Sequence, residues 1–137
     1  MEMAIQNSEI NKEDIDYINA HATSTPIGDL AEINAIKRVF MNCQKEVYIS
    51  SFKGSIGHML GAAGACETLL TILACKEKII PPTKNLNEID PAIVLNSYLR
   101  LNRDEIKIKQ RKMIALKNSF GFGGTNASIV VSSYSSD

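Results

Sequence analysis

Both histidines of this 137-residue chain stand where a side chain could act on a carbonyl group. His21 follows the apolar run at residues 15–18, which predicts a strand, and precedes the hydroxyl-rich stretch ATSTP. His58 follows a second strand-like run, VYISSF, near the expected start of a helix. Open α/β sheets place their ligands at the carboxyl ends of strands, so the position of His21 favours a catalytic role. The alternative is a core histidine that is satisfied by backbone groups.

Three charged residues accompany the histidines. A helix N-terminus disfavours imidazolium, so His58 is expected to stay neutral and to donate a hydrogen bond to a carbonyl oxygen, or else to act only as a cap. Lys53 follows the second strand, while Asp29 and Glu32 lie three residues apart on one helical face. A lysine near these carboxylates is either a structural ion pair or a tuned polar network. The same two carboxylates could also hold a cation.

A glycine-rich run, SFGFGGTN, occupies residues 119–126. It is not a dinucleotide-binding fingerprint, because Asn126 stands where the third glycine belongs, and no Lys-Ser/Thr pair makes it a phosphate-binding loop. It can present backbone N–H groups to an oxygen that gains negative charge, or it is a tight hairpin. No serine, cysteine or aspartate sits in a recognisable nucleophile elbow.

The composition favours one folded domain, with 45% hydrophobic and 22% charged residues. Lysine plus arginine equals aspartate plus glutamate at 15 each, so no global charge favours nucleic acid. A solvated loop or hairpin explains the densest basic stretch better than a binding patch does; it comprises Lys107, Lys109, Arg111 and Lys112. The longest apolar run, near residues 69–75, is too short to span a bilayer, and no signal peptide is visible.

Three cysteines, Cys43, Cys66 and Cys75, form no CxxC pair and no metal-ligand spacing with histidine. Their odd number favours reduced thiols over a disulfide framework. We therefore expect no structural metal and a reducing environment.

The order of expected elements indicates an α/β sheet flanked by helices. We expect a helix end at residues 1–8, a strand at 16–20, a helix from Pro26 capped by Thr25, a strand at 47–52 and a helix at about 58–76. Small residues at 57–65 predict that this last helix is buried on most sides. Residues 83–104 look loop-rich, with a short strand at 93–95, before two final strands from 113 and at 127–132 that pair antiparallel.

Four stretches, NAHATSTPIGDLAE, SFKGSIGHMLGAAGA, IPPTKNL and NSFGFGGTNASIV, together resemble the C-terminal half of a β-ketoacyl-acyl carrier protein synthase. The resemblance is to the elongating, KAS II type of the thiolase-like superfamily, and it runs over nearly the whole chain. The paired histidines distinguish the chain from thiolases and from initiating synthases. One departure is Ala22, where the family usually has glycine.

This resemblance implies an activity and a role for each matched residue. The family condenses malonyl-acyl carrier protein, with loss of carbon dioxide, onto an acyl chain held by a cysteine, which is fatty-acid elongation. The implied catalytic residues are His21 and His58, which hold the malonyl thioester carbonyl, together with Lys53 and its acidic partner Glu32. Phe122 matches the gating phenylalanine that also helps to form the oxyanion hole, and Thr23 and Thr25 match hydroxyls along the pantetheine path.

The resemblance also implies what lies outside these residues. Residues 1–137 would be the partial C-terminal thiolase-like domain, without its first, central strand, and the nucleophilic cysteine would belong to the N-terminal half. We expect such a fragment to be inactive alone and prone to association. The implied partners are acyl carrier protein, the N-terminal half and a second copy in a homodimer, without nucleic acid or membrane. No cofactor is implied beyond the phosphopantetheine arm of the carrier protein, and no metal. The compartment is the bacterial cytoplasm, or a plastid-like organelle or mitochondrion in a eukaryote.

Two other classes of protein remain open at this stage. One is a non-condensing subunit of the chain-length-factor kind, or a piece of a polyketide ketosynthase, since the missing half holds the decisive residue. The other is a standalone interaction module.

Overall fold

The computed structural model describes residues 1–109 and 112–134. Its helices are short at the N-terminus and longer where they cover the sheet: α1 (Glu2–Asn7), α2 (Pro26–Val39), α3 (Lys53–Ile56) and α4 (Ala63–Glu77), with 3-10 turns η1 (Lys12–Asp14), η2 (Leu60–Ala62) and η3 (Phe122–Gly124). The strands are β1 (Tyr17–Asn19), β2 (Val47–Ser50), β3 (Ile79–Ile80), β4 (Leu99–Leu101), β5 (Ile106–Lys107), β6 (Ile114–Phe120) and β7 (Asn126–Ser132).

Five strands form one mixed sheet in the order β4-β2-β1-β6-β7. Strand β1 is parallel to both β2 and β6, with Ile18 level with Ile49 on one side and Leu116 on the other. Strand β7 runs antiparallel to β6, as the sequence predicts. All three residues of β1 are buried, which is typical of a parallel strand covered on both faces. The predicted α/β class with a mixed sheet is confirmed.

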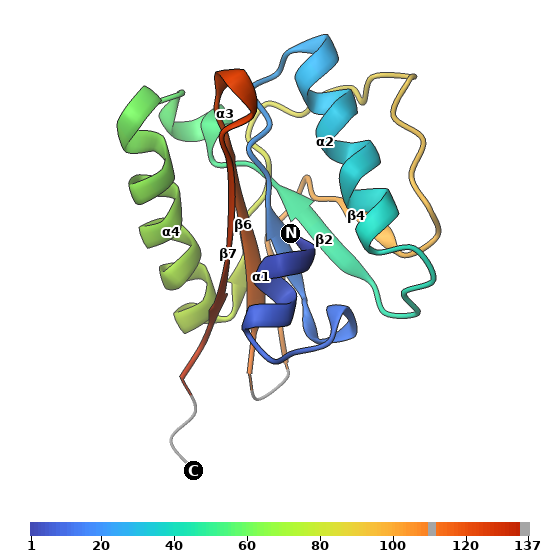
Figure 1. Cartoon of the computed structure of the whole chain (residues 1–137), viewed down its shortest axis with the longest axis vertical. Helices are drawn as coiled ribbons and strands as arrows, with labels where there is room; N and C mark the ends of the chain where they lie inside the picture. Colours follow the sequence, from blue (N-terminus) through green and yellow to red (C-terminus); the bar gives the residue numbers. More distant parts are fainter. Residues whose placement is uncertain (110–111, 135–137) are drawn as a thin grey trace.

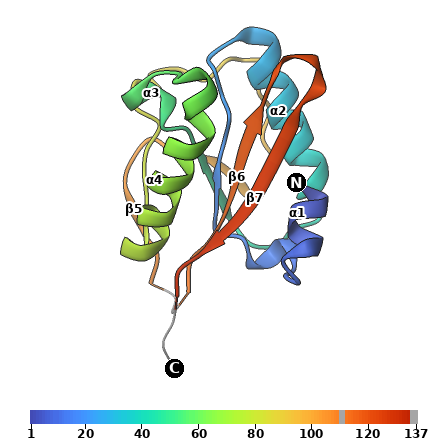
Figure 2. The same cartoon turned by 60° about the vertical axis from the view of Figure 1, so that its left-hand side comes forward.

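Helices cover the two faces of this sheet. Figures 1 and 2 show α1 and α2 on one face and α4 on the other. Successive residues of β1 point to opposite faces, so Ile18 joins the core beneath α2 with Ile33 and Ile36, while Tyr17 joins the cluster that contains Cys75 of α4. Helix α2 begins at Pro26 after Thr25, as predicted, although the Thr25 side chain makes no capping hydrogen bond.

The helix expected at residues 58–76 begins later than predicted. Positive φ angles at Gly57 (74°) and Leu60 (50°) break the backbone, and α4 starts at Ala63 after the 3-10 turn η2. The expectation that this helix is buried on most sides is also wrong for this chain. One stripe faces the sheet, including Glu67, whereas Leu69 and Leu73 on the outer side are 62% and 52% exposed.

The loop-rich segment contains a strand, but not at the predicted place. Residues 93–95 form no strand, because Ala92 and Ile93 turn back on Asp90: both N–H groups donate to it, at 2.9 Å and 2.8 Å. The strand β4 follows instead, where Leu99 is level with Val47 of β2. The position of this strand is therefore set by burial against β2, and the β-branched residues at 93 and 94 do not determine it.

Two further expectations concern the edges of the fold. Lys107 lies in β5, which pairs antiparallel with β3 and is exposed, while Arg111 lies outside the described residues. Among the described residues the main sheet is unbroken in its hydrogen bonding, so a further strand could join only beyond β4 or β7. The expected vacancy at a central position is therefore wrong. No helix of the described part is long and apolar enough to cross a membrane.

Candidate active site

The carboxyl ends of β1, β2 and β6 lie at one edge of the sheet because these strands are parallel. His21 comes two residues after β1, Lys53 opens α3 three residues after β2, and Phe120 ends β6. His58 follows α3 by two residues. Residues far apart in the sequence are thus brought to one place by strand topology.

The two histidines face each other at this edge. Their ring centroids are 5.5 Å apart and the planes are nearly perpendicular, at 87°. Phe120 packs against the His21 ring at 5.7 Å between centroids. The His58 Nδ1 atom accepts a hydrogen bond from the Leu60 N–H at 3.2 Å. A neutral His58 therefore carries its proton on Nε2, which can donate to an incoming oxygen.

His21 is neutral over most of the pH range. Burial, together with the nearby positive charges of Lys53 and Lys117, lowers its pKa to about 4. Its Nδ1 atom is buried without a hydrogen-bond partner in the part of the chain that the structure describes. His21 is thus available as a neutral imidazole at neutral pH.

Glu32 holds the loop that carries His21. Its two carboxylate oxygens accept hydrogen bonds from the backbone N–H groups of His21 and Ala22, at 2.9 Å and 2.8 Å. The Asn118 side-chain amide donates to Glu32 Oε1 at 3.0 Å. The implied pairing of Glu32 with Lys53 is therefore wrong here, because both oxygens of Glu32 are used to shape the loop.

The partner of Lys53 is Glu67 on α4, with Nζ and Oε1 2.5 Å apart. Lys117 of β6 pairs with the other oxygen, with Nζ and Oε2 2.6 Å apart. All three side chains are buried, with relative exposures of 7%, 1% and 2% for Lys53, Glu67 and Lys117. Sequence reasoning missed Glu67 and Lys117. The available signal was that Glu67 is the one acidic residue between Gly57 and Cys75.

The loop between β1 and α2 is strained and organised by hydroxyls. Ala22 has a φ of 23° and Ser24 a φ of 60°, conformations that favour glycine. This agrees with the sequence observation that glycine is usual at position 22 in the family. Thr23 Oγ1 and Thr25 Oγ1 lie 3.2 Å apart, and Asp29 accepts from the Ser24 N–H at 3.1 Å. Burial raises the pKa of Asp29.

Comparison with known proteins agrees with this arrangement. Residues 1–87 match the family described as "Beta-ketoacyl synthase, C-terminal domain". The chain belongs to the β-ketoacyl synthase family. It is 41% identical over 134 residues to 3-oxoacyl-[acyl-carrier-protein] synthase 2 of Rhizobium meliloti, covering 98% of this chain and 30% of that protein. It is 44% identical to a mitochondrial 3-oxoacyl-[acyl-carrier-protein] synthase of Arabidopsis thaliana, covering 97% of this chain and 28% of that protein.

A solved structure of this family has the same fold. The crystal structure of a β-ketoacyl synthase from Burkholderia phymatum matches with a TM-score of 0.81 at 37% identity, covering 95% of this chain and 30% of that chain. This β-ketoacyl synthase domain thus spans about 30% of the length of the relatives that it matches. The recognition of the C-terminal part of a synthase, and its thiolase-like fold, is confirmed.

Phe122 of this β-ketoacyl synthase domain lies in the turn formed by the glycine-rich run. It begins the η3 turn that joins β6 to β7, and its side chain is fully exposed. Gly123 and Gly124 have φ angles of 80° and 84°, and Gly121 N–H donates to Thr125 O at 2.7 Å. The glycine-rich run therefore forms the tight hairpin that the sequence left as one of two readings, while Phe120 is the phenylalanine at His21.

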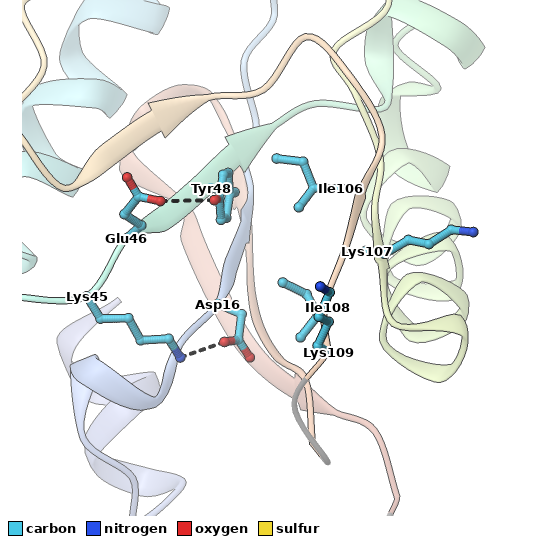
Figure 3. Close-up of a pocket in the computed structure, with 8 residues that line it drawn as sticks. All are labelled: Asp16, Lys45, Glu46, Tyr48, Ile106, Lys107, Ile108 and Lys109. Atoms are coloured by element: carbon cyan, nitrogen blue, oxygen red, sulfur yellow. Dashed lines mark hydrogen bonds and ion pairs between the residues drawn. The ribbon is translucent and has the colours of Figure 1, made fainter.

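A cavity of about 370 Å³ lies at the opposite end of the sheet, next to Asp16, which precedes β1 (Figure 3). Four of its polar groups are paired with one another: Lys45 with Asp16 at 2.5 Å, and the Tyr48 hydroxyl donating to Glu46 at 3.0 Å. It is remote from the chemistry at His21. Among the described residues no three histidine, cysteine or acidic side chains gather as metal ligands.

Gly54 fastens α3 to the segment at residues 81–87. A Cβ atom at Gly54 would meet the Lys84 carbonyl oxygen at 2.3 Å, and Thr83 Oγ1 accepts from the Ser51 N–H at 3.1 Å. We expect Gly54→Ala to lower the free energy of unfolding by about 1–3 kcal/mol, because the backbone at Lys84 must move to make room for the added methyl group. Urea denaturation measures this, with Gly61→Ala as the control, since nothing lies within 4 Å of that Cβ position. Equal midpoints for both variants would contradict the close approach.

Proposed function

We propose that this chain is the C-terminal part of a 3-oxoacyl-[acyl-carrier-protein] synthase that elongates fatty acids. In the proposed reaction, a cysteine thiolate first takes the acyl group from acyl carrier protein by thioester exchange. Malonyl carrier protein then loses carbon dioxide, and the electron pair of the broken C–C bond forms an enolate. The enolate carbon attacks the acyl thioester, the C–S bond breaks, and the thiolate is regenerated with a 3-oxoacyl product two carbons longer.

The observation that carries this proposal is the pair of histidines 5.5 Å apart. His58 is set up to donate from Nε2, because its Nδ1 accepts from Leu60. His21, with a pKa lowered by burial to about 4, is neutral at neutral pH. The N–H groups of the two imidazoles can hold the malonyl thioester oxygen and stabilise it as negative charge develops.

The remaining residues have supporting roles in this proposal. Lys53 places its ammonium group near the histidines, paired with Glu67, and Glu32 fixes the His21 backbone. Thr23 and Thr25 offer hydroxyls to the pantetheine arm that carries the substrate. Phe122, exposed on a hairpin with glycines on both sides, is free to swing as a gate, and its backbone N–H would contribute to the oxyanion hole.

The proposed nucleophile is a cysteine outside these 137 residues. Burial raises the pKa of Cys75 to about 12, so its thiol is inert at neutral pH. Cys43 is also buried, with its Sγ directed at the Lys45 carbonyl oxygen at 3.6 Å. After exposure of this chain to an acyl-acyl carrier protein thioester, we expect intact mass and peptide mapping to find no acyl group on Cys43, Cys66 or Cys75. A stoichiometric adduct on one of them would overturn the division of roles.

A non-condensing, chain-length-factor-like subunit is the second candidate. The solved structure titled "The ishigamide ketosynthase/chain length factor" matches with a TM-score of 0.82 at 30% identity, covering 98% of this chain and 32% of that chain. The intact histidine pair and the paired Lys53 favour condensation, because a subunit without chemistry has no need of a neutral His21. The presence or absence of a reactive cysteine in the complete protein discriminates the two.

The outer face of α4 is the proposed contact with the N-terminal half. Leu69, Ile72 and Leu73 lie on it and are 62%, 44% and 52% exposed in the described chain. Figure 1 shows α4 at the left-hand edge of the molecule, on its side of the sheet. Apolar side chains grouped on one helix face are typical of an interface. Acyl carrier protein and a second copy in a homodimer are the other proposed partners, in the cytoplasm of a bacterium or in an organelle of a eukaryote.

Leu73→Asp tests this contact. In the complete protein we expect a loss of about 2–4 kcal/mol in the free energy of unfolding, because the charge would enter an apolar interface. In this chain alone the same change should alter the free energy by less than about 0.5 kcal/mol, because Leu73 is exposed. Met41→Asp, in the turn after α2, is the control for an exposed apolar residue. If Leu73→Asp changes the free energy of unfolding equally in both proteins, the proposed contact with the N-terminal half is wrong.

The function itself is tested with the complete protein that contains this chain. We expect it to release carbon dioxide from malonyl-acyl carrier protein and to form a 3-oxoacyl product when acyl carrier protein thioesters are supplied. A folded complete protein that forms neither carbon dioxide nor a condensed product would reject the condensing function and favour the non-condensing subunit.

A further inference from the structure

The Lys117 ammonium is a buried charge that the reaction above does not use. Its side chain is 2% exposed, and Nζ lies 2.6 Å from Glu67 Oε2 and 2.9 Å from Ser119 Oγ. It also donates to the Asn118 carbonyl oxygen. Lys117 stands in the middle of β6, with Leu116 completely buried beside it. A lysine in such a place is costly, since ion pairs withdrawn from water gain little over apolar side chains of the same size.

The charges around Glu67 do not balance. Lys53 and Lys117 contribute two positive charges and Glu67 only one negative charge, so the buried group of three is left with a net charge of +1. If Lys117 were absent, the pair of Lys53 and Glu67 would be neutral. The excess positive charge beneath the histidines is therefore the consequence of Lys117.

We propose that Lys117 is a positioning residue of the condensing site: its ammonium holds the Glu67 carboxylate against Lys53 and leaves the buried group of three with a net positive charge near the histidine pair. This charge opposes the protonation of His21. This inference rests on the proposed function, because it assigns Lys117 to the same reaction. Lys117 acts through Glu67 and through the electrostatic potential, and touches no substrate. A positive potential at this place also favours the negative charge that develops when malonate loses carbon dioxide.

The groups that face His21 come from every element around it. Lys53 of α3, Lys117 of β6 and His58 oppose a positive charge on His21, and Glu67 of α4 favours it. Glu32 of α2 accepts from the His21 backbone, and its carboxylate also bonds Asn118. Lys117 does not contact the substrate in the proposed reaction. Its charge can therefore be removed by substitution without the loss of a substrate contact.

Two variants separate charge from shape. Lys117→Met keeps the unbranched side chain up to the position of the lysine Cε and lowers the net charge of the group of three to zero. Lys117→Met combined with Glu67→Gln restores +1, carried by Lys53 alone. The control is Lys107→Met, which removes an exposed lysine on β5. Each is made in the complete synthase, and thermal unfolding shows that it folds.

The measurement is the pH dependence of kcat/KM for decarboxylation of malonyl-acyl carrier protein. In Lys117→Met we expect the acidic limb to move up by roughly 0.5–1 pH unit, with KM unchanged, because one positive charge no longer opposes protonation of His21. A full unit would cost about two-fold in kcat/KM at pH 5. In the double variant the midpoint of the acidic limb should return toward the wild-type value. In Lys107→Met the midpoint should be the same as in the wild type. A folded Lys117→Met protein with the wild-type limb, or a double variant that stays shifted with the single one, would overturn the inference.

Failure of the proposed function can be distinguished from failure of the inference about Lys117. If the proposed function is wrong, the wild-type protein releases no carbon dioxide from malonyl-acyl carrier protein. In that case ¹³C NMR titration of His21 in the same proteins, assigned with His21→Gln, decides the inference without catalysis. The His21 midpoint should rise in Lys117→Met and return in the double variant. No rise would reject the role of Lys117.

Discussion

Replacement of either histidine should stop decarboxylation of malonyl-acyl carrier protein. In the complete synthase we expect His58→Ala and His21→Ala each to lower kcat by about 10²–10⁴-fold, because each removes a neutral hydrogen-bonding group from the developing enolate. His58→Gln should lose less than His58→Ala, since the amide N–H of glutamine can stand in for Nε2–H. Release of ¹⁴C-labelled carbon dioxide measures all of these. Met3→Ala, at an exposed position on α1, is the control.

The dependence on pH follows from the charge state of His21. Its pKa of about 4 lies below the ordinary value of 6.5, so the neutral form dominates down to that pH. Activity that needs neutral His21 should therefore be constant from pH 7 to about pH 5 and fall as the pH drops through 4. An acidic limb centred at 6.5 would show that His21 is not buried among positive charges in the working enzyme. Wild-type decarboxylation by either alanine variant would remove the assigned roles.

The sequence predicts this site where local pattern and sheet topology agree. Apolar runs ending in His21 and in the segment before Lys53 predict two strands, and parallel pairing brings their carboxyl ends together. The antiparallel hairpin of β6 and β7 is also predictable, because glycines separate two β-rich segments. These features depend on residues within one or two elements.

Features that depend on distant contacts could not be predicted in this way. Glu67 and Lys117 are 50 positions apart, and only the packing of α4 on β6 brings them to 2.6 Å. The positive φ at Leu60, which delays α4, has no signature in an apolar residue. Strand β4 is placed by its register with β2, whereas local propensity favoured residues 93–95. The acidic partner of Lys53 was misassigned for the same reason.

Removal of the Glu67 carboxylate should have the largest effect on stability. Glu67→Ala leaves the ammonium groups of Lys53 and Lys117 buried without the carboxylate that both contact. We expect the free energy of unfolding to fall by about 3–5 kcal/mol, a large share of the stability of a domain this size. Urea denaturation at pH 7 measures the loss, and Glu77→Ala, exposed at the end of the same helix, is the control.

The pH dependence of that loss identifies its cause. Burial already lowers the pKa of Lys117, and removal of Glu67 lowers it further, so the ammonium can lose its proton as the pH rises. The deficit of Glu67→Ala relative to the wild type should therefore shrink between pH 7 and pH 10. Adding Lys117→Met to Glu67→Ala should recover part of the stability at pH 7, because one unpaired charge is gone. A deficit that is the same at both pH values and in both backgrounds would mean that Glu67 stabilises the fold by packing, and that the buried charges do not interact as the structure indicates.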